Sequence, residues 1–220
     1  MQFRIIDITT GISERTPVYE GDPKPVFEKV SSIEKDGFMV SRISIGTHTG
    51  SHVDAPSHLY ETGQSAGDLD PASFMGRAVL LDLSSGEGPI TNVELENVYA
   101  SHSAGESVDV ILIKTRTCSM SGQETPHTGR MLAATAGKWI LDNGFRVVGV
   151  DTLSVDDDDS LPNHQLFLSN NINIVEYLNL KDALPGIYFF ICLPLKLEGC
   201  DGAPARAILM DAQVFDKILP

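Results

Sequence analysis

An apolar strand, a helix and a second apolar strand follow one another between residues 108 and 151. This succession constrains the fold more than any other part of the sequence. The predicted strands are residues 108–114 (VDVILIK) and 146–151 (RVVGVD), and the predicted helix is residues 129–143. Gly144 follows the helix, at the place where a glycine often ends one. This order forms a βαβ unit, which requires a parallel strand pair with a right-handed crossover.

Further strands are predicted on both sides of this unit, and nothing divides the chain into parts. The run at 39–45 alternates in its side chains, which predicts a strand that is buried on at least one face. Thr91 and Glu94 form a capping box that opens a short helix reaching about Tyr99. We therefore predict one α/β domain over residues 1–220, with a mixed sheet and flanking helices. Its other predicted strands are residues 4–8, 26–31, 78–83, 187–195 and 207–210.

The histidines are concentrated in one stretch of the sequence. His48, His52 and His58, three of six in the chain, fall within eleven residues together with Asp54. Imidazole and carboxylate groups are ligands that zinc, manganese and iron prefer. His52 and Asp54 are two residues apart and can point to one side of an extended segment, while Gly50 permits a tight backbone that brings His48 back. We interpret the stretch as a metal site built on a loop. Surface histidines are the competing interpretation.

A histidine and a glutamate later in the chain are further candidates. His164 follows Pro162 and is predicted to lie in a loop, and Glu176 lies in the apolar run at 172–180. A carboxylate among apolar neighbours is costly to bury unless it is paired or ligates a cation. From the residues alone, a solvent-facing Glu176 is the slightly favoured interpretation.

Three other segments are less informative. Tyr19 lies in a turn-rich loop at 17–23, where it can equally well line a pocket or cover the edge of the core. The four aspartates at 156–159 most often form a solvated loop, and they lack the ligand spacing and glycine of a calcium-binding EF-hand. Residues 118–128 show no clear pattern.

The charge and the cysteines limit the partners and the compartment. A net charge of -14 argues against binding to nucleic acid, and it also disfavours anionic membrane surfaces. Three cysteines without CxxC spacing favour free thiols in a reducing compartment. No signal peptide and no run of about 18 apolar residues is found. We expect a cytoplasmic protein that acts on a small molecule.

The motif at residues 48–58 resembles the signature H-x-G-T-H-x-D-x-P-x-H of the cyclase family of metal-dependent hydrolases. This family includes bacterial-type arylformamidase (kynurenine formamidase) and isatin hydrolase. Only Ser51 departs from the signature, and it keeps the hydroxyl of the usual threonine. The segment PVYEGDP resembles the family's early aromatic-(Pro)-Gly-Asp-Pro loop, with Glu20 where proline is common, and EGCDGAPARAIL resembles its closing turn and strand. The spacing of His164 and Glu176 matches the family's second ligand pair.

The resemblance implies a metal centre of one or two divalent ions, zinc or manganese. His48, His52 and Asp54 would hold one ion. Asp54 would bridge to a second ion held by His164 and Glu176. This expectation replaces the solvent-facing interpretation of Glu176.

The resemblance also implies an activity, a fold and an assembly. His58, beside the metal, would be the acid/base residue of a hydrolase that cleaves a C–N bond in an amide, aryl formamide or cyclic amide. Tyr19 is a candidate for stacking on an aromatic substrate. The implied fold is the cyclase-family fold, of a swivelling β/β/α-like kind, usually assembled as a homodimer or homotetramer.

Two other functions stay open at this point. One is a metal-dependent cyclase or dehydratase on the same scaffold. The other is a non-catalytic metal-binding or interaction protein, against which the additional histidine His58 argues. A serine hydrolase is disfavoured because no G-x-S-x-G motif is present.

Overall fold

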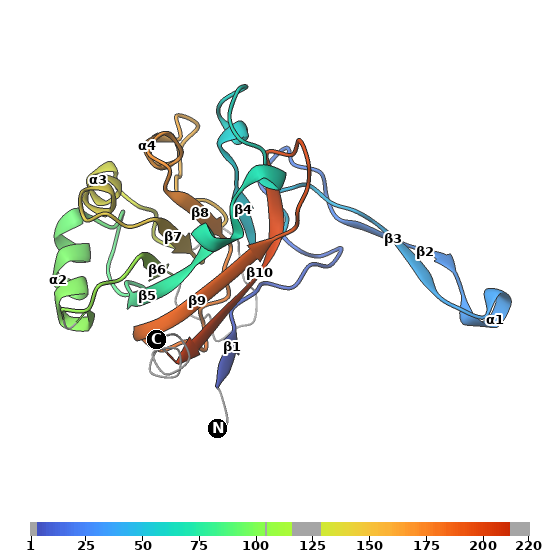
Figure 1. Ribbon diagram of the computed structural model, residues 1–220, viewed down its shortest axis with the longest axis horizontal. Coiled ribbons are helices and arrows are strands. Elements are labelled where there is room, and N and C mark those ends of the chain that lie inside the picture. The colour runs from blue at the N-terminus through green and yellow to red at the C-terminus, as the bar shows by residue number, and fades with distance from the viewer. Residues whose placement is uncertain (1–3, 104, 116–128, 212–220) are drawn as a thin grey trace.

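A mixed sheet that curls back on itself forms the centre of the protein (Figure 1). The computed structural model describes residues 4–103, 105–115 and 129–211. Eight strands follow one another in the order β1-β10-β4-β8-β7-β6-β5-β9, and β9 also pairs with β10, which closes the sheet into a barrel-like ring. The strands are β1 (Ile5–Asp7), β4 (His52–Asp54), β5 (Met75–Asp82), β6 (Val110–Lys114), β7 (Val147–Val150), β8 (Asn173–Glu176), β9 (Gly186–Pro194) and β10 (Gly202–Asp211).

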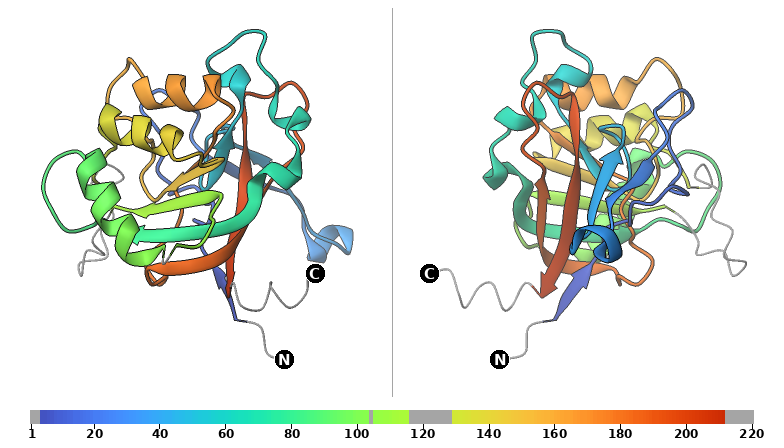
Figure 2. Two further views of the ribbon diagram at one scale, coloured as in Figure 1. Left: turned by 60° about the vertical axis from the view of Figure 1, so that its left-hand side comes forward. Right: turned by 90° about the vertical axis from the view of Figure 1, so that its right-hand side faces the viewer.

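Three helices cover one side of this sheet, as the left view of Figure 2 shows. They are α2 (Asn92–His102), α3 (Ala134–Asp142) and α4 (Pro162–Ser169). Successive side chains of a strand point to opposite faces. Ile111 and Ile113 of β6 therefore pack in the cluster beneath the helices, whereas Val110 and Leu112 pack in the second core cluster of the sheet. Three short 3-10 helices, η1 (Pro56–His58), η2 (Ala66–Asp68) and η3 (Pro71–Phe74), occupy the connection between β4 and β5.

The predicted βαβ unit is confirmed, but its helix is shorter than expected. Strands β6 and β7 pair in parallel. Helix α3 begins at Ala134 because Leu132, just before it, forms a bridge with Ile90 in extended conformation. Gly144 follows the helix in the left-handed conformation, with φ of +76°, which agrees with its predicted role as a helix end. The capping box at Thr91 and Glu94 is also confirmed.

A two-stranded ribbon projects from the body of the protein (Figure 1). It consists of β2 (Val26–Ser31) and β3 (Val40–Ser44), paired antiparallel and joined through the short helix α1 (Ile33–Asp36). Every residue of β3 is exposed, so the predicted burial of this strand on one face is wrong. The alternation is real, but it does not correspond to a buried face of β3. We call residues 26–44 the arm.

One local prediction about the candidate site is also wrong, and another holds in part. His164 was predicted in a loop, but it lies in α4, where Pro162 occupies a first-turn position that needs no hydrogen-bonding N–H. The metal-ligand stretch was interpreted as a loop; His52 and Asp54 lie in strand β4, which confirms the extended segment expected for this pair. A strand of three residues is too short to leave a periodic pattern.

The segment at 118–128 lies outside the described residues. No described helix is long and apolar enough to cross a membrane.

Candidate metal centre

Strand β4 places two candidate ligands on one face of the sheet. It pairs with β10 on one side and with β8 on the other, and His52 lies directly opposite Glu176 in β8. Because side chains alternate along a strand, His52, Asp54 and Glu176 share one face, whereas Val53 packs into the core on the other face. All three polar side chains are buried, and Glu176 is only 4% exposed. The solvent-facing interpretation of Glu176 is therefore wrong.

A loop and a helix bring two more histidines to the same point. Gly50, two residues after His48, has a φ of +69°, which agrees with the tight backbone expected there. Nδ1 of His48 lies 2.9 Å from Oδ1 of Asp54. Helix α4 brings Nε2 of His164 to 3.4 Å from Asp54 and 3.3 Å from Glu176.

These residues form two overlapping groups of potential metal ligands. In each group the ligand atoms lie within 4.8 Å of one another. Asp54 belongs to both groups, which is the arrangement expected of a carboxylate that bridges two ions. The groups are His48, His52 and Asp54, and Asp54, His164 and Glu176.

Each of the three histidines uses one ring nitrogen to face the central carboxylates and the other to contact an outer acceptor. Such outer acceptors fix the ring orientation and the tautomer of histidines that bind metals. The pattern shows three preoriented imidazoles rather than three surface side chains. The acceptors are Asp201 at 2.9 Å for His48, the Gly50 carbonyl at 2.8 Å for His52 and Asp156 at 2.8 Å for His164.

The electrostatics of the centre favour a cation. Burial alone would lower the pKa of His52, but the carboxylates of Asp54 and Glu176 raise it to about 10. Burial would likewise lower the pKa of His164, but Asp156, Asp54 and Glu176 raise it to about 12. Two buried carboxylates thus face these imidazoles, and a divalent cation can balance their negative charge.

Two buried atoms at the centre have no hydrogen-bond partner. They are Nε2 of His52 and Oδ2 of Asp54, both of which face the other candidate ligands. An unsatisfied buried polar atom is costly, and an imidazole nitrogen beside a carboxylate oxygen is a donor pair suited to zinc or manganese. The residues present therefore fit a divalent metal ion.

A cavity of about 240 Å³ opens onto the centre, and we call it the site cavity. Its walls include His48, His52, His164 and Glu176, and also the two residues predicted to act on substrate, His58 and Tyr19. His58 ends the short helix η1, and its ring centroid lies 4.3 Å from that of His48. Its Nδ1 lies 3.4 Å from Oδ2 of Asp201, the carboxylate that also contacts His48. Of the predicted site residues, all but Asp54 line this cavity, and Asp54 is buried with its Oδ1 2.9 Å from Nδ1 of His48.

Sequence reasoning missed the two outer carboxylates. Asp156 was assigned to a solvated loop, but it is buried at 3% exposure and contacts His164, whereas the three aspartates after it are exposed. Nothing in a run of four aspartates distinguishes the first. Asp201 lies in the segment that resembles the family's closing turn. That resemblance predicted the turn, but it did not predict the contacts of Asp201 with His48 and His58.

Three comparisons with known proteins agree with this geometry. Residues 6–157 match the model of the Cyclase family. The chain is 34% identical over 212 residues to kynurenine formamidase of Salinibacter ruber, an alignment that covers 94% of this chain and 98% of that one. It is 29% identical to a solved structure from Bacillus stearothermophilus described as a predicted metal-dependent hydrolase, with a TM-score of 0.79 and coverage of 96% of this chain and 100% of that one.

A third similarity concerns the fold alone. Isatin hydrolase A of Labrenzia aggregata superposes with a TM-score of 0.81 at 20% identity, covering 95% of this chain and 94% of that one. These two superpositions cover 96% and 95% of the chain, so the fold as a whole is shared with these structures.

Proposed function

The chain belongs to the cyclase family, and from that premise we propose that it is a metal-dependent hydrolase of non-peptide C–N bonds whose substrate is an aryl formamide. One observation carries the proposal. Two ligand groups that share Asp54 lie beside a cavity that His58 also lines. His58 belongs to neither of these groups, although it forms a third group of potential ligands with His48 and Asp201. Holding a metal does not require that histidine, whereas hydrolysis requires a group that moves protons. The similarity to kynurenine formamidase along the whole chain supports the formamide class.

We propose that His48, His52 and Asp54 hold one divalent ion, zinc or manganese, and that Asp54, His164 and Glu176 hold a second. When bound, such an ion supplies Lewis acidity, which polarises a carbonyl and lowers the pKa of a water from 15.7 to roughly 7.

His58 is the proposed acid/base residue, and Asp201 orients it. Partial burial would raise the pKa of Asp201, but hydrogen bonds from His48 and Thr47 lower it to about 2, so it remains a carboxylate. A carboxylate only accepts hydrogen bonds, so Nδ1 of His58 donates to it and Nε2 is left as the base. His58 then takes the proton of the attacking water and gives it to the leaving nitrogen. Such transfers contribute typically ~10²–10⁴-fold to the rate.

Tyr19 is the proposed contact for the aromatic part of the substrate. It lines the site cavity together with four of the proposed metal ligands, and it is 39% exposed. Aromatic pairs stabilise one another when offset or edge-on.

The test uses metal-stripped protein reconstituted with zinc or with manganese and supplied with N-formylkynurenine or isatin. We expect metal-dependent release of formate from N-formylkynurenine. His58→Ala should keep its metal but lose about 10²–10⁴-fold in turnover. His102→Ala is the matched control, because His102 lies on α2 and its Nδ1 forms hydrogen bonds within that helix.

Two results would contradict this assignment. Loss of metal from the His58→Ala protein would make His58 a ligand. A reconstituted protein that holds metal but turns over neither substrate would place the substrate outside this class.

Three further points remain predictions: one domain over residues 1–220, the swivelling β/β/α-like class of fold, and assembly as a homodimer or homotetramer. The sheet supports the first, because its strands come from both ends of the described chain.

A further inference from the structure

A third group of potential metal ligands lies beside the proposed metal centre. It consists of His48, His58 and Asp201, whose ligand atoms lie within 4.8 Å of one another. Oδ2 of Asp201 lies 2.9 Å from Nε2 of His48 and 3.4 Å from Nδ1 of His58. Neither His58 nor Asp201 belongs to the two groups that share Asp54. We call these three residues the outer group.

The spacing of the outer group is that of a zinc site. Zinc binds imidazole nitrogens and carboxylate oxygens at about 2.0–2.2 Å in a tetrahedron, so neighbouring ligand atoms lie roughly 3.3–3.6 Å apart. The 3.4 Å separation between His58 and Asp201 falls in this range, and the 2.9 Å separation between His48 and Asp201 needs only a small outward movement. Three protein ligands leave a fourth position to solvent, as in many zinc sites.

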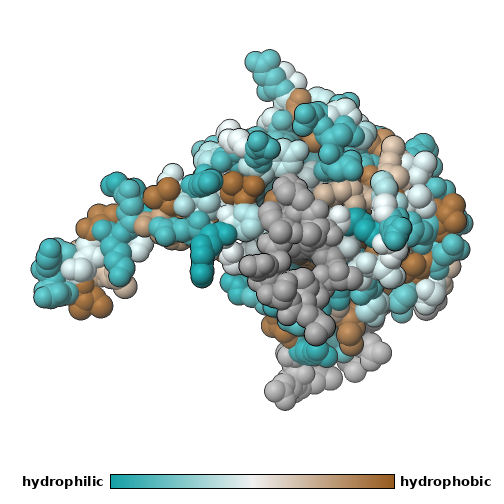
Figure 3. All heavy atoms as spheres, turned by 180° about the vertical axis from the view of Figure 1, so that it is seen from behind, coloured by the Kyte–Doolittle hydropathy of each residue, from teal (hydrophilic) through white to brown (hydrophobic). Residues whose placement is uncertain are grey.

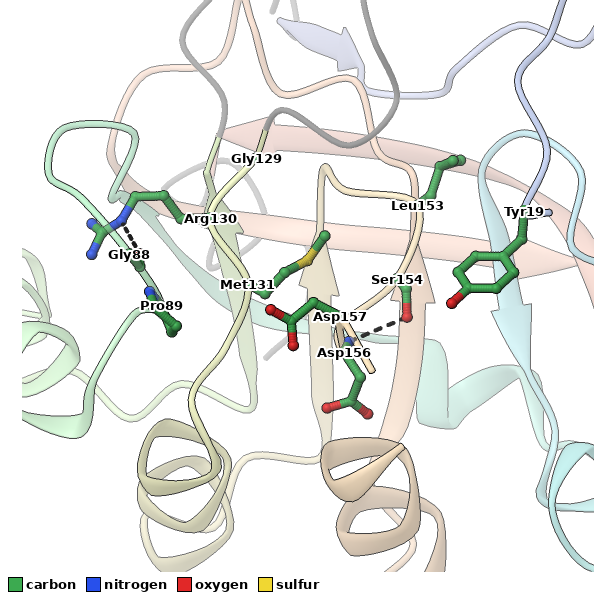
Figure 4. A pocket seen from close by; sticks show the side chains of 10 residues that line it. All are labelled: Tyr19, Gly88, Pro89, Gly129, Arg130, Met131, Leu153, Ser154, Asp156 and Asp157. Atoms are coloured by element: carbon green, nitrogen blue, oxygen red, sulfur yellow. Dashed lines mark hydrogen bonds between the residues drawn. The ribbon is translucent and has the colours of Figure 1, made fainter. Parts of the chain in front are cut away.

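A threonine holds the carboxylate of the outer group in place. Oγ1 of Thr47 donates to Oδ1 of Asp201 at 2.9 Å, while Oδ2 faces the two histidines. The other outer acceptor, Asp156, contacts a single histidine of the described chain, His164. Figure 4 shows Asp156 in the wall of a second cavity, of about 460 Å³, which no described histidine lines. Of the two outer carboxylates, Asp201 is thus the one placed to share an ion with two imidazoles.

The outer group is more open to solvent than the metal centre. The side chains of Asp201 and His58 are 45% and 28% exposed, whereas that of Asp54 is 1% exposed. Attraction between an ion and its ligands weakens where water surrounds them. We therefore expect the outer group to bind an ion more weakly than the buried centre does, and to fill only when the free ion is in excess.

We propose that the outer group binds a further zinc ion when zinc is in excess, and that this ion inhibits the protein. The inhibition rests on the proposed function, in which Nε2 of His58 is the base. An ion on Nδ1 displaces the hydrogen from that nitrogen, and the neutral ring then carries its hydrogen on Nε2. In that form His58 cannot take the proton of the attacking water.

The shared histidine does not make the two ions exclude each other. His48 directs Nδ1 at Asp54 and Nε2 at Asp201, so it offers a different ring nitrogen to each group. The hydrogen on Nε2 is released to solvent when the further ion binds, since a ligating nitrogen must be free of its proton. Zinc should fill the outer group better than manganese, because sites of nitrogen and oxygen ligands bind zinc more tightly.

The first experiment counts bound zinc. Wild-type protein and the variants His58→Ala and Asp201→Asn are dialysed against excess zinc, and the zinc held by each chain is measured. We expect each variant to hold a single zinc ion fewer than the wild type. When only enough zinc is supplied to fill the metal centre, His58→Ala should hold as much as the wild type, as the proposed function requires.

The second experiment follows turnover of N-formylkynurenine as zinc is raised. Wild-type turnover should fall at saturation to the level of His58→Ala, about 10²–10⁴-fold lower, because both proteins then lack the base. It should recover when the excess zinc is dialysed away. The residual turnover of His58→Ala should not respond to excess zinc, because its outer group is incomplete. Manganese at the same concentrations should inhibit the wild type less.

Asp159→Asn is the matched control. Asp159 lines the same site cavity, but it belongs to none of the three ligand groups. This variant should bind the further zinc ion and lose turnover in excess zinc as the wild type does.

The outcomes separate this inference from the function on which its inhibitory part rests. Equal zinc counts in the wild type and both outer-group variants, or equal inhibition of the wild type and His58→Ala, overturns the inference and leaves the hydrolase assignment in place. Absence of turnover at every zinc concentration overturns the hydrolase assignment and the inhibition with it, and the zinc counts then decide whether the outer group is a metal site.

Discussion

One buried carboxylate, Asp156, has two tasks at the start of α4. It accepts a hydrogen bond from the ring of His164, and it accepts others from the backbone nitrogens of Asn163 and His164 at 3.0 and 2.9 Å. It thus orients a proposed ligand and satisfies N–H groups that the first turn of a helix leaves without partners.

Replacing Asp156 should therefore weaken metal binding, although Asp156 is not itself a proposed metal ligand. We expect Asp156→Ala to lower metal affinity by about 10- to 100-fold, the usual effect of losing an outer acceptor. Competition with a graded chelator measures this, and Asp158→Ala serves as the control in the same loop. Equal metal retention by the two variants would show that Asp156 does not orient His164.

The residues of the site differed in how far the sequence revealed them. His48, His52 and Asp54 are close in the chain, so the chain itself keeps them together and their pattern is visible. The orientation of Glu176 depends on the register of β8 against β4, a pairing of distant segments, so only the family resemblance identified it. Asp201 and Asp156 reach the site through contacts that no local pattern encodes.

Helices α3 and α4 touch at a point where only a glycine fits. A Cβ on Gly137 of α3 would lie 2.0 Å from Oδ1 of Asn163 in α4. Asn163 cannot turn away easily, because its side-chain nitrogen donates to Asp156 and to the carbonyl of Leu132.

Gly137→Ala should for this reason destabilise the protein, although alanine is the better helix former. We expect a loss of about 1–3 kcal/mol in the free energy of unfolding, as for other overpacked cores, together with weaker metal binding through the displaced His164. Urea denaturation measures the first effect. Lys138→Ala, at the next and exposed position, is the control. A Gly137→Ala protein as stable as the wild type would refute the close contact.

The elements divide by length and burial into those that the sequence revealed and those that it did not. Strands β5, β6 and β9 carry long apolar runs because both of their faces are covered, and all three were predicted. Strand β4 has only three residues, and two of them are the polar His52 and Asp54. Its burial is therefore not visible in the sequence as an apolar run. Strand β3 has the alternation of a half-buried strand but lies in the arm.

At the scale of the whole molecule, the arm exposes several large apolar side chains. Ile33, Phe38, Met39 and Ile43 are each more than half exposed, and brown apolar side chains are visible along the arm in Figure 3. A two-stranded ribbon is at best marginally stable by itself. We therefore expect a second copy of the chain to cover the arm, consistent with the predicted homodimer or homotetramer.

The double variant Ile33→Asp, Phe38→Asp should be a folded monomer, because charges on the arm oppose its burial. Light scattering coupled to gel filtration gives the mass, and circular dichroism checks the fold. Val93→Asp is the control, since Val93 is equally exposed but lies on α2. A monomeric wild-type protein, or an unchanged mass in the double variant, would contradict the expectation.

The pairing of β4 with β10 has a consequence for the newly made protein. During translation the histidine of β4 and the one in the loop before it leave the ribosome about 150 residues ahead of Asp201 and the paired residues 202–204. Until those residues follow, β4 lacks one neighbour and His48 lacks its outer acceptor. The metal centre can therefore mature only after the start of β10 has been made, so a nascent chain stalled before β10 would carry the ligand motif without the site.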